Sequence, residues 1–326
     1  MNDKRVVVIG GTGHIGTYLI PLLVEAGHQV VSVSRGQKKP YLPHGAWKNV
    51  EQVEMDRKQE EEKGLFGKHI VELEPNIVID LICFTPKSAK MLVESIRGEV
   101  EHLLLCGTIW VHGPSAEVPT TEDQPRNPLE KYGKDKAKIE DYLLTESRKN
   151  GFPSTVLHPG HIVGQGWVPV NPAGNKSIEV FSKLAKGQEL NLPNIGLETL
   201  HHVHAKDVAQ GFYKAMINWN SAVGESFHIV SPAALTLRGF AHSIASWFGQ
   251  SAQLNFLSWE EWSKTVSDKE KDSTWNHISH SPNCSINKAQ KAINYNPRYY
   301  SLQAVKESLR WLIDKGKLDA ELPYTN

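Results

Sequence analysis

Cysteine is scarce in this chain of 326 residues, which contains only Cys83, Cys106 and Cys284. The number is odd and the positions are far apart, so the sequence predicts neither a disulfide framework nor a zinc site. Two of the three lie in apolar runs. We therefore expect three reduced packing residues in a cytoplasmic protein.

The sequence also lacks an excess of either charge, because Lys+Arg and Asp+Glu both number 36 and the pI is about 7.3. This balance gives no electrostatic footprint for nucleic acid or for an anionic membrane. No apolar run reaches transmembrane length, and the first one is too short for a signal peptide. We expect a soluble intracellular chain of one large or two joined domains, with no membrane or nucleic-acid partner.

Glycines near the N-terminus form a regular pattern that follows a predicted buried strand at 6–9 and opens a predicted helix. In this pattern, Gly10 permits a tight turn, Gly13 lets the backbone approach a pyrophosphate, and Gly16 allows close packing of helix against strand. A second apolar strand follows. A glycine turn that holds no ligand is the alternative, but the strand–turn–helix–strand context favours dinucleotide binding.

The second strand ends in Ser34 and Arg35, and Lys38 and Lys39 follow after two intervening residues. A carboxylate here would accept hydrogen bonds from the adenosine ribose of NAD, whereas guanidinium and ammonium groups suit the 2′-phosphate of NADP. The sequence therefore slightly favours NADP over NAD. The alternatives are a solvated basic loop and a site for NAD.

The spacing Gly10-x-x-Gly13-x-x-Gly16, with Thr12 inside it, resembles the short-chain dehydrogenase/reductase superfamily, in which a Tyr-x-x-x-Lys pair is the catalytic signature. Tyr132 and Lys136 have that spacing, and on a helix they lie one turn apart on the same face. A solvated helix surface would explain the pair equally well if it stood alone. The glycine turn predicts a bound dinucleotide, and this cofactor gives the Tyr132–Lys136 pair a reaction to catalyse.

The strand at 101–106 and its exit resemble those of the extended members, the epimerases and dehydratases that act on sugar nucleotides. There the strand closes in Val-Tyr-Gly, and here it closes in Val-His-Gly, with His112 replacing the tyrosine. Thr108 falls on the family's catalytic hydroxyl position, 24 residues before Tyr132. The resemblance implies that Tyr132 exchanges the substrate proton, that Lys136 lowers the tyrosine pKa and holds the nicotinamide ribose, and that Thr108 orients the substrate oxygen.

The same resemblance implies a set of cofactor contacts. Asp56 matches the residue that bonds the adenine amino group, and Pro159 would line the nicotinamide pocket, with His158 where arginine is usual. The full expected set is Gly10, Thr12, Gly13, His14, Ile15, Gly16, Ser34, Arg35, Asp56, Tyr132, Lys136 and Pro159.

The implied fold is α/β: a Rossmann doubly wound parallel sheet with a smaller C-terminal substrate-binding domain. We expect the Rossmann domain at 1–165 with a return segment at about 200–232, and the smaller domain at 166–199 and 233–326. Asp207 is expected to cap the helix of the return segment. The histidines at 201, 202 and 204 have no carboxylate or cysteine to complete a metal site, so we expect none.

The substrate is less well defined by the sequence. Trp110, His161 and Arg238 are the weaker substrate candidates. Relatives that bind nucleotide sugars usually place arginines in the C-terminal part, where this chain has few. A smaller sugar, polyol or hydroxy-carbonyl compound therefore remains open.

The predicted function is that of an NAD(P)-dependent oxidoreductase or epimerase, acting at a secondary alcohol or ketone of a sugar or nucleotide-sugar-like substrate. A dehydratase is disfavoured, because Ile109 and Trp110 stand where those enzymes carry an acidic pair. The alternative is a non-catalytic dinucleotide-binding regulator or RNA-associated protein. The resemblance also implies a homodimer built on a four-helix bundle that includes the helix of Tyr132.

Overall fold

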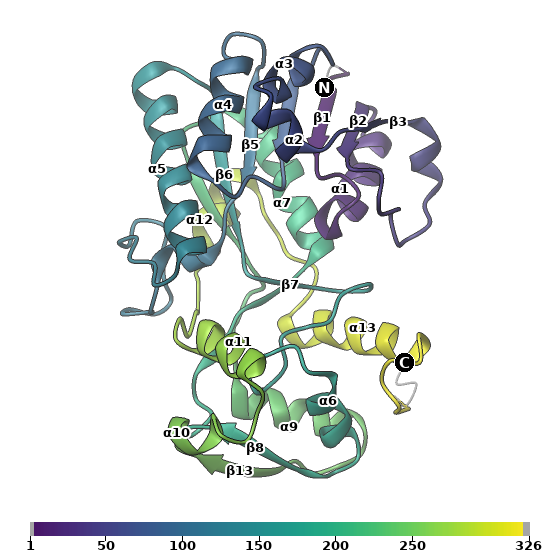
Figure 1. Ribbon diagram of the computed structural model, residues 1–326, viewed down its shortest axis with the longest axis vertical. Helices are drawn as coiled ribbons and strands as arrows, with labels where there is room; N and C mark the ends of the chain where they lie inside the picture. The colour runs from purple at the N-terminus through teal and green to yellow at the C-terminus, as the bar shows by residue number, and fades with distance from the viewer. Residues whose placement is uncertain (1–2, 322–326) are drawn as a thin grey trace.

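A seven-stranded, wholly parallel sheet organises the computed structural model, which describes residues 3–321 (Figure 1). Its strand order is β11-β6-β5-β4-β1-β2-β3. The strands are β1 (Arg5–Ile9), β2 (Gln29–Ser34), β3 (Val50–Glu54), β4 (Ile77–Asp80), β5 (His102–Cys106), β6 (Ser154–Pro159) and β11 (Ser226–Ile229). The order reverses direction at β1, which confirms the predicted doubly wound α/β fold.

Helices cover both faces of this sheet. Alternate side chains of each strand point to opposite faces, and those on both faces are apolar. Val6 and Val8 of β1 join the core beneath α1 (His14–Glu25), α7 (Ala205–Ile217) and α12 (Asn287–Ile293). Val7 and Ile9 join the opposite core beneath α3 (Phe66–Val71), α4 (Pro86–Ile96) and α5 (Lys131–Asn150). The helix α2 (Arg57–Glu62) follows β3 directly. Continuous β-branched strands therefore indicated burial on both faces correctly.

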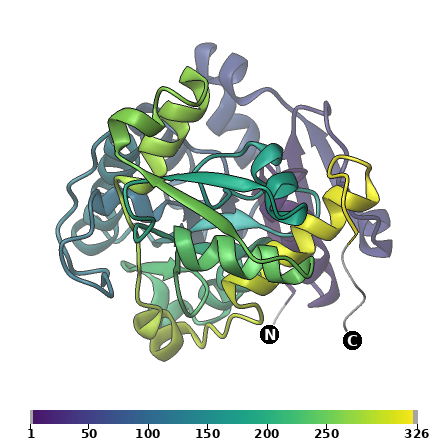
Figure 2. The ribbon, with the colours of Figure 1, turned by 90° about the horizontal axis from the view of Figure 1, so that it is seen from below.

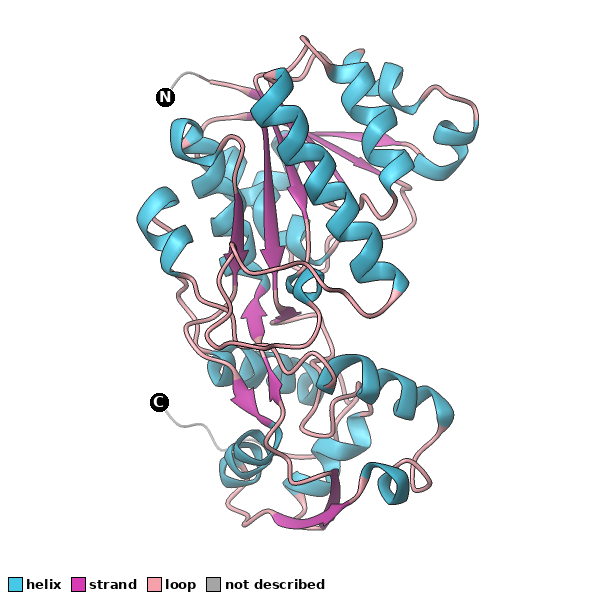
Figure 3. Cartoon of the chain, turned by 90° about the vertical axis from the view of Figure 1, so that its left-hand side faces the viewer, coloured by secondary structure: helices cyan, strands magenta, loops and turns pink. Residues whose placement is uncertain are grey.

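The rest of the chain builds a smaller part below the carboxyl ends of the strands (Figures 1 and 3). Its own core gathers Phe181, Leu192, Phe240, Trp262 and Leu309. The elements outside the main sheet are η1 (Gly45–Asn49), η2 (Ile109–His112), β7 (His161–Val163), α6 (Ile178–Ala185), β8 (Glu189–Pro193), β9 (Thr199–Leu200), β10 (His202–His204), α8 (Trp219–Ala222), β12 (Leu235–Thr236), α9 (Leu237–Trp247), β13 (Gln253–Leu257), α10 (Trp259–Trp262), α11 (Asp268–Ile278) and α13 (Ser301–Asp314). Seen from below, β8 and β13 run alongside one another across this part (Figure 2).

One segment packs differently from the predicted division of the chain. Within 233–326, the stretch that contains Cys284, Ile286, Ala289 and Ile293 belongs to the core of the main sheet. The reason is that α12 is apolar on one side and lies against β11 and α7. The return segment does contribute α7 and β11 to the main fold, and the two-domain division itself stays a prediction.

The cap expected at Asp207 was assigned to the wrong residue. The helix α7 begins at Ala205, and its N-cap is His204, whose Nδ1 accepts the N–H of Lys206 at 2.9 Å. Asp207 lies three residues after this N-cap, inside the first turn of α7, so it is not the capping residue. It is buried and instead accepts the N–H groups of Arg298 and Tyr299, at 2.8 and 3.0 Å.

The neighbouring histidines have separate hydrogen-bond partners. The Nε2 atoms of His201 and His202 lie 2.8 and 3.0 Å from the carbonyl oxygens of Ser231 and Val170. His204 lies 2.7 Å from the Glu307 carboxylate. These three side chains therefore connect the strand segment 201–204 to two loops and to α13.

The three cysteines are free and buried, which confirms the packing role predicted for them. Within residues 3–321, no helix has both the length and the hydropathy needed to cross a membrane.

Candidate active site

The glycine turn forms a cradle at the carboxyl end of β1. Gly10 has a φ of +88°, and a Cβ on it would lie 2.8 Å from Cγ2 of Ile82. A Cβ on Gly16 would lie 2.0 Å from the Gly11 carbonyl oxygen, so the helix and the turn touch through backbone alone. Gly13 caps α1 without a side-chain hydrogen bond. The first N–H groups of α1 are therefore available to a phosphate, as a dinucleotide requires.

A cavity of about 670 Å³ lies on the nucleotide side of this cradle. Six of the predicted cofactor contacts line it: Gly10, Thr12, Gly13, Ser34, Arg35 and Asp56. The side chain of Lys38 also lines this cavity. Oδ1 of Asp56 also caps α2 by accepting the N–H groups of Lys58 and Gln59 at 3.0 and 3.3 Å. This cap fixes the carboxylate at the end of β3, where the adenine end of a dinucleotide would lie.

A second cavity, of about 380 Å³, lies on the other side of the glycine turn. It brings together Thr108, Tyr132, Lys136, Pro159 and His161, and its wall includes His14 and Ile15. The two cavities share Gly10, Gly13, Ile82 and Phe84. One extended ligand can therefore pass across the glycine turn from one cavity into the other, so these residues fit a dinucleotide.

Tyr132 and Lys136 lie in the first two turns of α5. The ammonium of Lys136 is buried, donates a hydrogen bond to the carbonyl oxygen of Cys106, and lies 5.9 Å from the centroid of the Tyr132 ring. Loss of solvent raises the pKa of Tyr132 above its ordinary value, Cys106 raises it further, and the Thr108 hydroxyl opposes the shift. Tyr132 is therefore protonated near neutral pH, and a further positive charge, such as that of an oxidised nicotinamide, would lower its pKa.

Two hydrogen bonds fix Thr108, one through its hydroxyl oxygen and one through its backbone N–H. Its Oγ1 accepts the N–H of Trp110 at 3.3 Å, which makes it the N-cap of η2. Its own N–H donates to Nδ1 of His158 at 3.0 Å. The histidine that replaces the family's arginine therefore fixes the peptide group of the candidate catalytic threonine.

Behind His158 lies a buried charged pair that sequence reasoning missed. Nε2 of His158 is 3.0 Å from Oε1 of Glu140, and Arg126 binds both oxygens of that carboxylate, at 2.8 and 2.6 Å. His158 and Arg126 hold the pKa of Glu140 well below its usual range, against the effect of burial. The available signal was the position of Glu140, one helical turn beyond Lys136 on the same face of α5.

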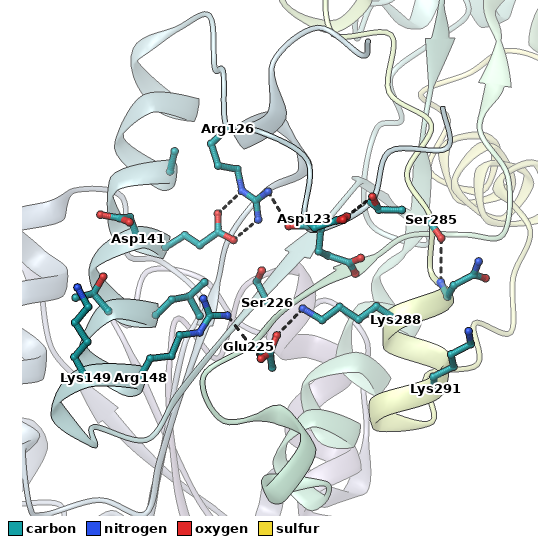
Figure 4. Close-up of a pocket in the computed structure, with 17 residues that line it drawn as sticks. Asp123, Arg126, Asp141, Arg148, Lys149, Glu225, Ser226, Ser285, Lys288 and Lys291 are labelled. Carbon is teal, nitrogen blue, oxygen red and sulfur yellow. Dashed lines mark hydrogen bonds and ion pairs between the residues drawn. The ribbon is translucent and has the colours of Figure 1, made fainter. Parts of the chain in front are cut away.

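The Arg126–Glu140 pair also lines a larger cavity of about 800 Å³ on the other side of α5 (Figure 4). Five cationic and five anionic side chains line it: Arg126, Arg148, Lys149, Lys288 and Lys291, with Glu122, Asp123, Glu140, Asp141 and Glu225. Figure 4 shows Glu225 between Arg148 and Lys288. None of the glycine-turn residues lines this cavity, so it is separate from the candidate active site.

Two weaker candidates occupy different positions. The Trp110 ring stacks on His280, with centroids 4.6 Å apart, and meets the Tyr132 ring edge-on at 6.1 Å. Arg238 is exposed on α9 with its guanidinium 5.4 Å from the Phe256 ring centroid, and it lines neither of the two cavities beside the glycine turn. Trp167 and His277, which are not among the three substrate candidates, reach the 380 Å³ cavity from distant parts of the chain.

The family model for the NAD dependent epimerase/dehydratase family matches residues 6–229. The chain belongs to this family. The match spans the glycine turn, Thr108, the Tyr132–Lys136 pair and the last strand of the main sheet. The resemblance inferred from the sequence is thereby confirmed at the level of the family.

Two curated relatives illustrate the range of proteins that this chain is similar to. A 2′-dehydrokanamycin reductase from Streptomyces kanamyceticus is 31% identical over 42% of this chain and 37% of its own length. A chloroplast stem-loop binding protein of 41 kDa from Arabidopsis thaliana is 26% identical over 75% of this chain and 63% of its own. The chain thus covers less than two thirds of the length of either relative.

Solved structures show the same fold. An epimerase from Methanothermobacter thermautotrophicus has a TM-score of 0.74 at 19% identity, covering 97% of this chain and 94% of that one. A UDP-glucose 4-epimerase from Thermotoga maritima, with UDP-glucose, has a TM-score of 0.72 at 18% identity, covering 95% and 99%. The smaller part of the chain is included in both matches.

Proposed function

We propose that this protein is an NAD(P)-dependent oxidoreductase or epimerase that acts at a secondary alcohol or ketone of a sugar-like substrate. The observation that carries the proposal is the 380 Å³ cavity. Thr108, Tyr132 and Lys136 line it together with Gly10 and Gly13 of the glycine turn. A bound nicotinamide would supply hydride transfer. The residues of the chain supply binding, orientation and proton exchange.

Each member of the Thr108–Tyr132–Lys136 set has a role that its surroundings support. The Thr108 hydroxyl binds and orients the substrate oxygen, since η2 and His158 fix its backbone. The Tyr132 hydroxyl takes or gives the proton of that oxygen. The buried Lys136 ammonium favours the phenolate form of Tyr132 and holds the ribose hydroxyls of the cofactor.

The test is Tyr132→Phe, with Tyr142→Phe on the same helix as the matched control. We expect Tyr132→Phe to lower the rate of cofactor reduction or oxidation by about 100-fold or more, which is the usual contribution of a general acid–base group. Affinity for the cofactor should change little. Tyr142→Phe should change neither quantity, because Tyr142 does not line the cavity.

We further propose a preference for NADP over NAD, supported by Arg35 and Lys38 at the wall of the nucleotide cavity.

A homodimer through α4 and α5, which lie side by side on one face of the sheet, is also proposed (Figure 1). Sedimentation of the purified protein measures this state directly. A cytoplasmic location stays a prediction.

A second candidate function is a dinucleotide-binding regulator or RNA-associated protein without turnover. The observation in its favour is the similarity to the stem-loop binding protein over 75% of this chain. The zero formal net charge and the assembled Tyr132–Lys136 pair favour the enzyme instead. If Tyr132→Phe left every biological activity of the protein unchanged, the second candidate would replace the first.

A further inference from the structure

The catalytic cavity has a distinct wall on the side of the smaller part of the chain, which we call the substrate wall. It consists of His161, Ile162, Trp167, Val168, Val170, Lys176 and His277. These residues come from β7, from the loop that follows it, and from α11. A substrate whose oxygen is bound by Thr108 and Tyr132 must place the rest of its ring against this wall.

His161 is the polar group of the substrate wall that lacks a partner. Both of its ring nitrogens are buried and form no hydrogen bond within the described part of the chain. Its ring lies 5.1 Å from that of His277 and 6.2 Å from that of Trp110. Buried polar groups are normally hydrogen-bonded, so this imidazole lacks a partner that a ligand can supply.

The chemistry of that partner follows from the charge of the wall. Burial lowers the pKa of His161 well below its ordinary value and that of His277 to about 4. Both rings are therefore neutral near pH 7. Nδ1 of His277 donates to the carbonyl oxygen of Ser273 at 2.6 Å, so this ring has its Nε2 acceptor left, whereas His161 offers both a donor and an acceptor. A hydroxyl also donates and accepts, so it matches such a ring better than a phosphate or an amine does.

Among the described residues, no arginine lines this cavity, so it offers a diphosphate no guanidinium. Arg238 lies over Phe256, and Arg298 lies over Tyr299, with centroid distances of 5.4 and 5.9 Å. Among the described residues of the substrate wall, Lys176 is the one cationic side chain. The cavity of about 380 Å³ must also contain the nicotinamide end of the cofactor, which restricts the space left for substrate.

We propose that the substrate is an uncharged, hydroxyl-rich ring compound of about monosaccharide size, such as a sugar or cyclitol, that carries no nucleoside diphosphate. His161 and His277 bind its hydroxyls, and the Trp167 and valine side chains contact its carbon skeleton. This inference rests on the proposed function, because it assigns the substrate of the same cavity.

The test is binding to the cofactor-loaded protein, measured by saturation-transfer NMR with glucose, myo-inositol, UDP and UDP-glucose as probes. We expect glucose or myo-inositol to bind in the millimolar range, and UDP-glucose to bind no more tightly than glucose. His161→Phe should weaken the uncharged probes at least tenfold. His161→Asn, which keeps a donor and an acceptor, should retain most of the binding.

Arg238→Ala serves as the control outside the cavity and should leave every probe unchanged. Micromolar binding of UDP or UDP-glucose, or its loss in Arg238→Ala, would overturn the inference and leave the proposed function intact. The absence of binding by both uncharged probes would overturn it as well. Failure to bind NAD or NADP, measured on the same preparation, would instead refute the proposed function.

Discussion

The backbone N–H of Thr108 donates a hydrogen bond to Nδ1 of His158 at 3.0 Å. Because Nδ1 accepts, a neutral His158 carries its proton on Nε2, which faces Oε1 of Glu140 at 3.0 Å. Arg126 then binds the same carboxylate at both oxygens. The position of the Thr108 backbone therefore depends on a buried row of polar groups that continues through His158 of β6 to Glu140 of α5 and to Arg126.

Removing the imidazole from this row should destabilise the protein. His158→Ala leaves the Thr108 N–H unpaired in the core and removes one partner of the buried Glu140, at a cost of about 2–4 kcal/mol. Urea unfolding measures this loss. His242→Ala, at an exposed position on α9, should change the free energy of unfolding by less than about 0.5 kcal/mol. Equal effects of the two changes would contradict the structural role of His158.

The Glu140 carboxylate should make stability depend on acid. Its folded-state pKa is held below the unfolded value, so its contribution is present above the unfolded pKa and is lost as the pH falls below about 5. Glu140→Gln should reduce the slope of unfolding free energy against pH by up to about 1.4 kcal/mol per pH unit in that range. Urea unfolding between pH 7 and pH 4 provides the measurement.

The matched control for that slope is Glu179→Gln. Glu179 forms an exposed pair with Lys183 at 3.6 Å, and such pairs contribute little. A slope unchanged by Glu140→Gln would show that the pair with Arg126 and His158 does not hold the charge in solution.

Gly13→Ala should separate cofactor binding from folding. Gly13 has φ −78° and ψ −173°, which alanine also adopts, and the nearest atom to a new Cβ is the Gly10 carbonyl oxygen at 3.2 Å. The methyl group would instead occupy the approach of a pyrophosphate to the backbone. We expect at least a tenfold loss of NAD(P) affinity by calorimetry, with a melting temperature close to that of the parent.

Gly45→Ala, where nothing lies within 4 Å of the added Cβ, is the control for a neutral glycine substitution. Unchanged NAD(P) affinity in Gly13→Ala would show that the cradle does not hold a dinucleotide.

The preference between cofactors should depend on Arg35. If the guanidinium binds the 2′-phosphate, Arg35→Ala should weaken NADP by about tenfold and NAD by less than twofold, because Arg forms strong bonds with phosphate. Competition between the two nucleotides measures the ratio. A higher affinity for NAD than for NADP in the unaltered protein would refute the proposed preference.

The sequence predicted the main fold well because its signals are local. The apolar strand at 6–9 and the glycines at 10, 13 and 16 are adjacent in the chain, and the helix of Tyr132 follows from its own periodicity. The family assignment needed only these stretches and the exit of β5. The structure then places Thr108, Tyr132 and Lys136 on one cavity with the glycine turn.

The parts that the sequence did not predict depend on contacts between distant residues. His158, Glu140 and Arg126 meet only when β6, α5 and the preceding loop are packed together. The position of Asp207 inside α7 shows the same limit, since its partners at 298 and 299 lie about ninety residues away. Trp167, in the loop after β7, and His277, in α11, line the cavity from distant parts of the chain and carry no local signal.

The central claim is that the glycine turn presents a dinucleotide to Tyr132 and Lys136. Its most direct test is to denature the freshly purified protein, identify any nucleotide released, and titrate the empty protein with NAD and NADP. We predict either stoichiometric retained NAD, as in an epimerase, or an empty site that binds NADP or NAD in the micromolar range. Binding of neither nucleotide would contradict the account from the glycine turn onward.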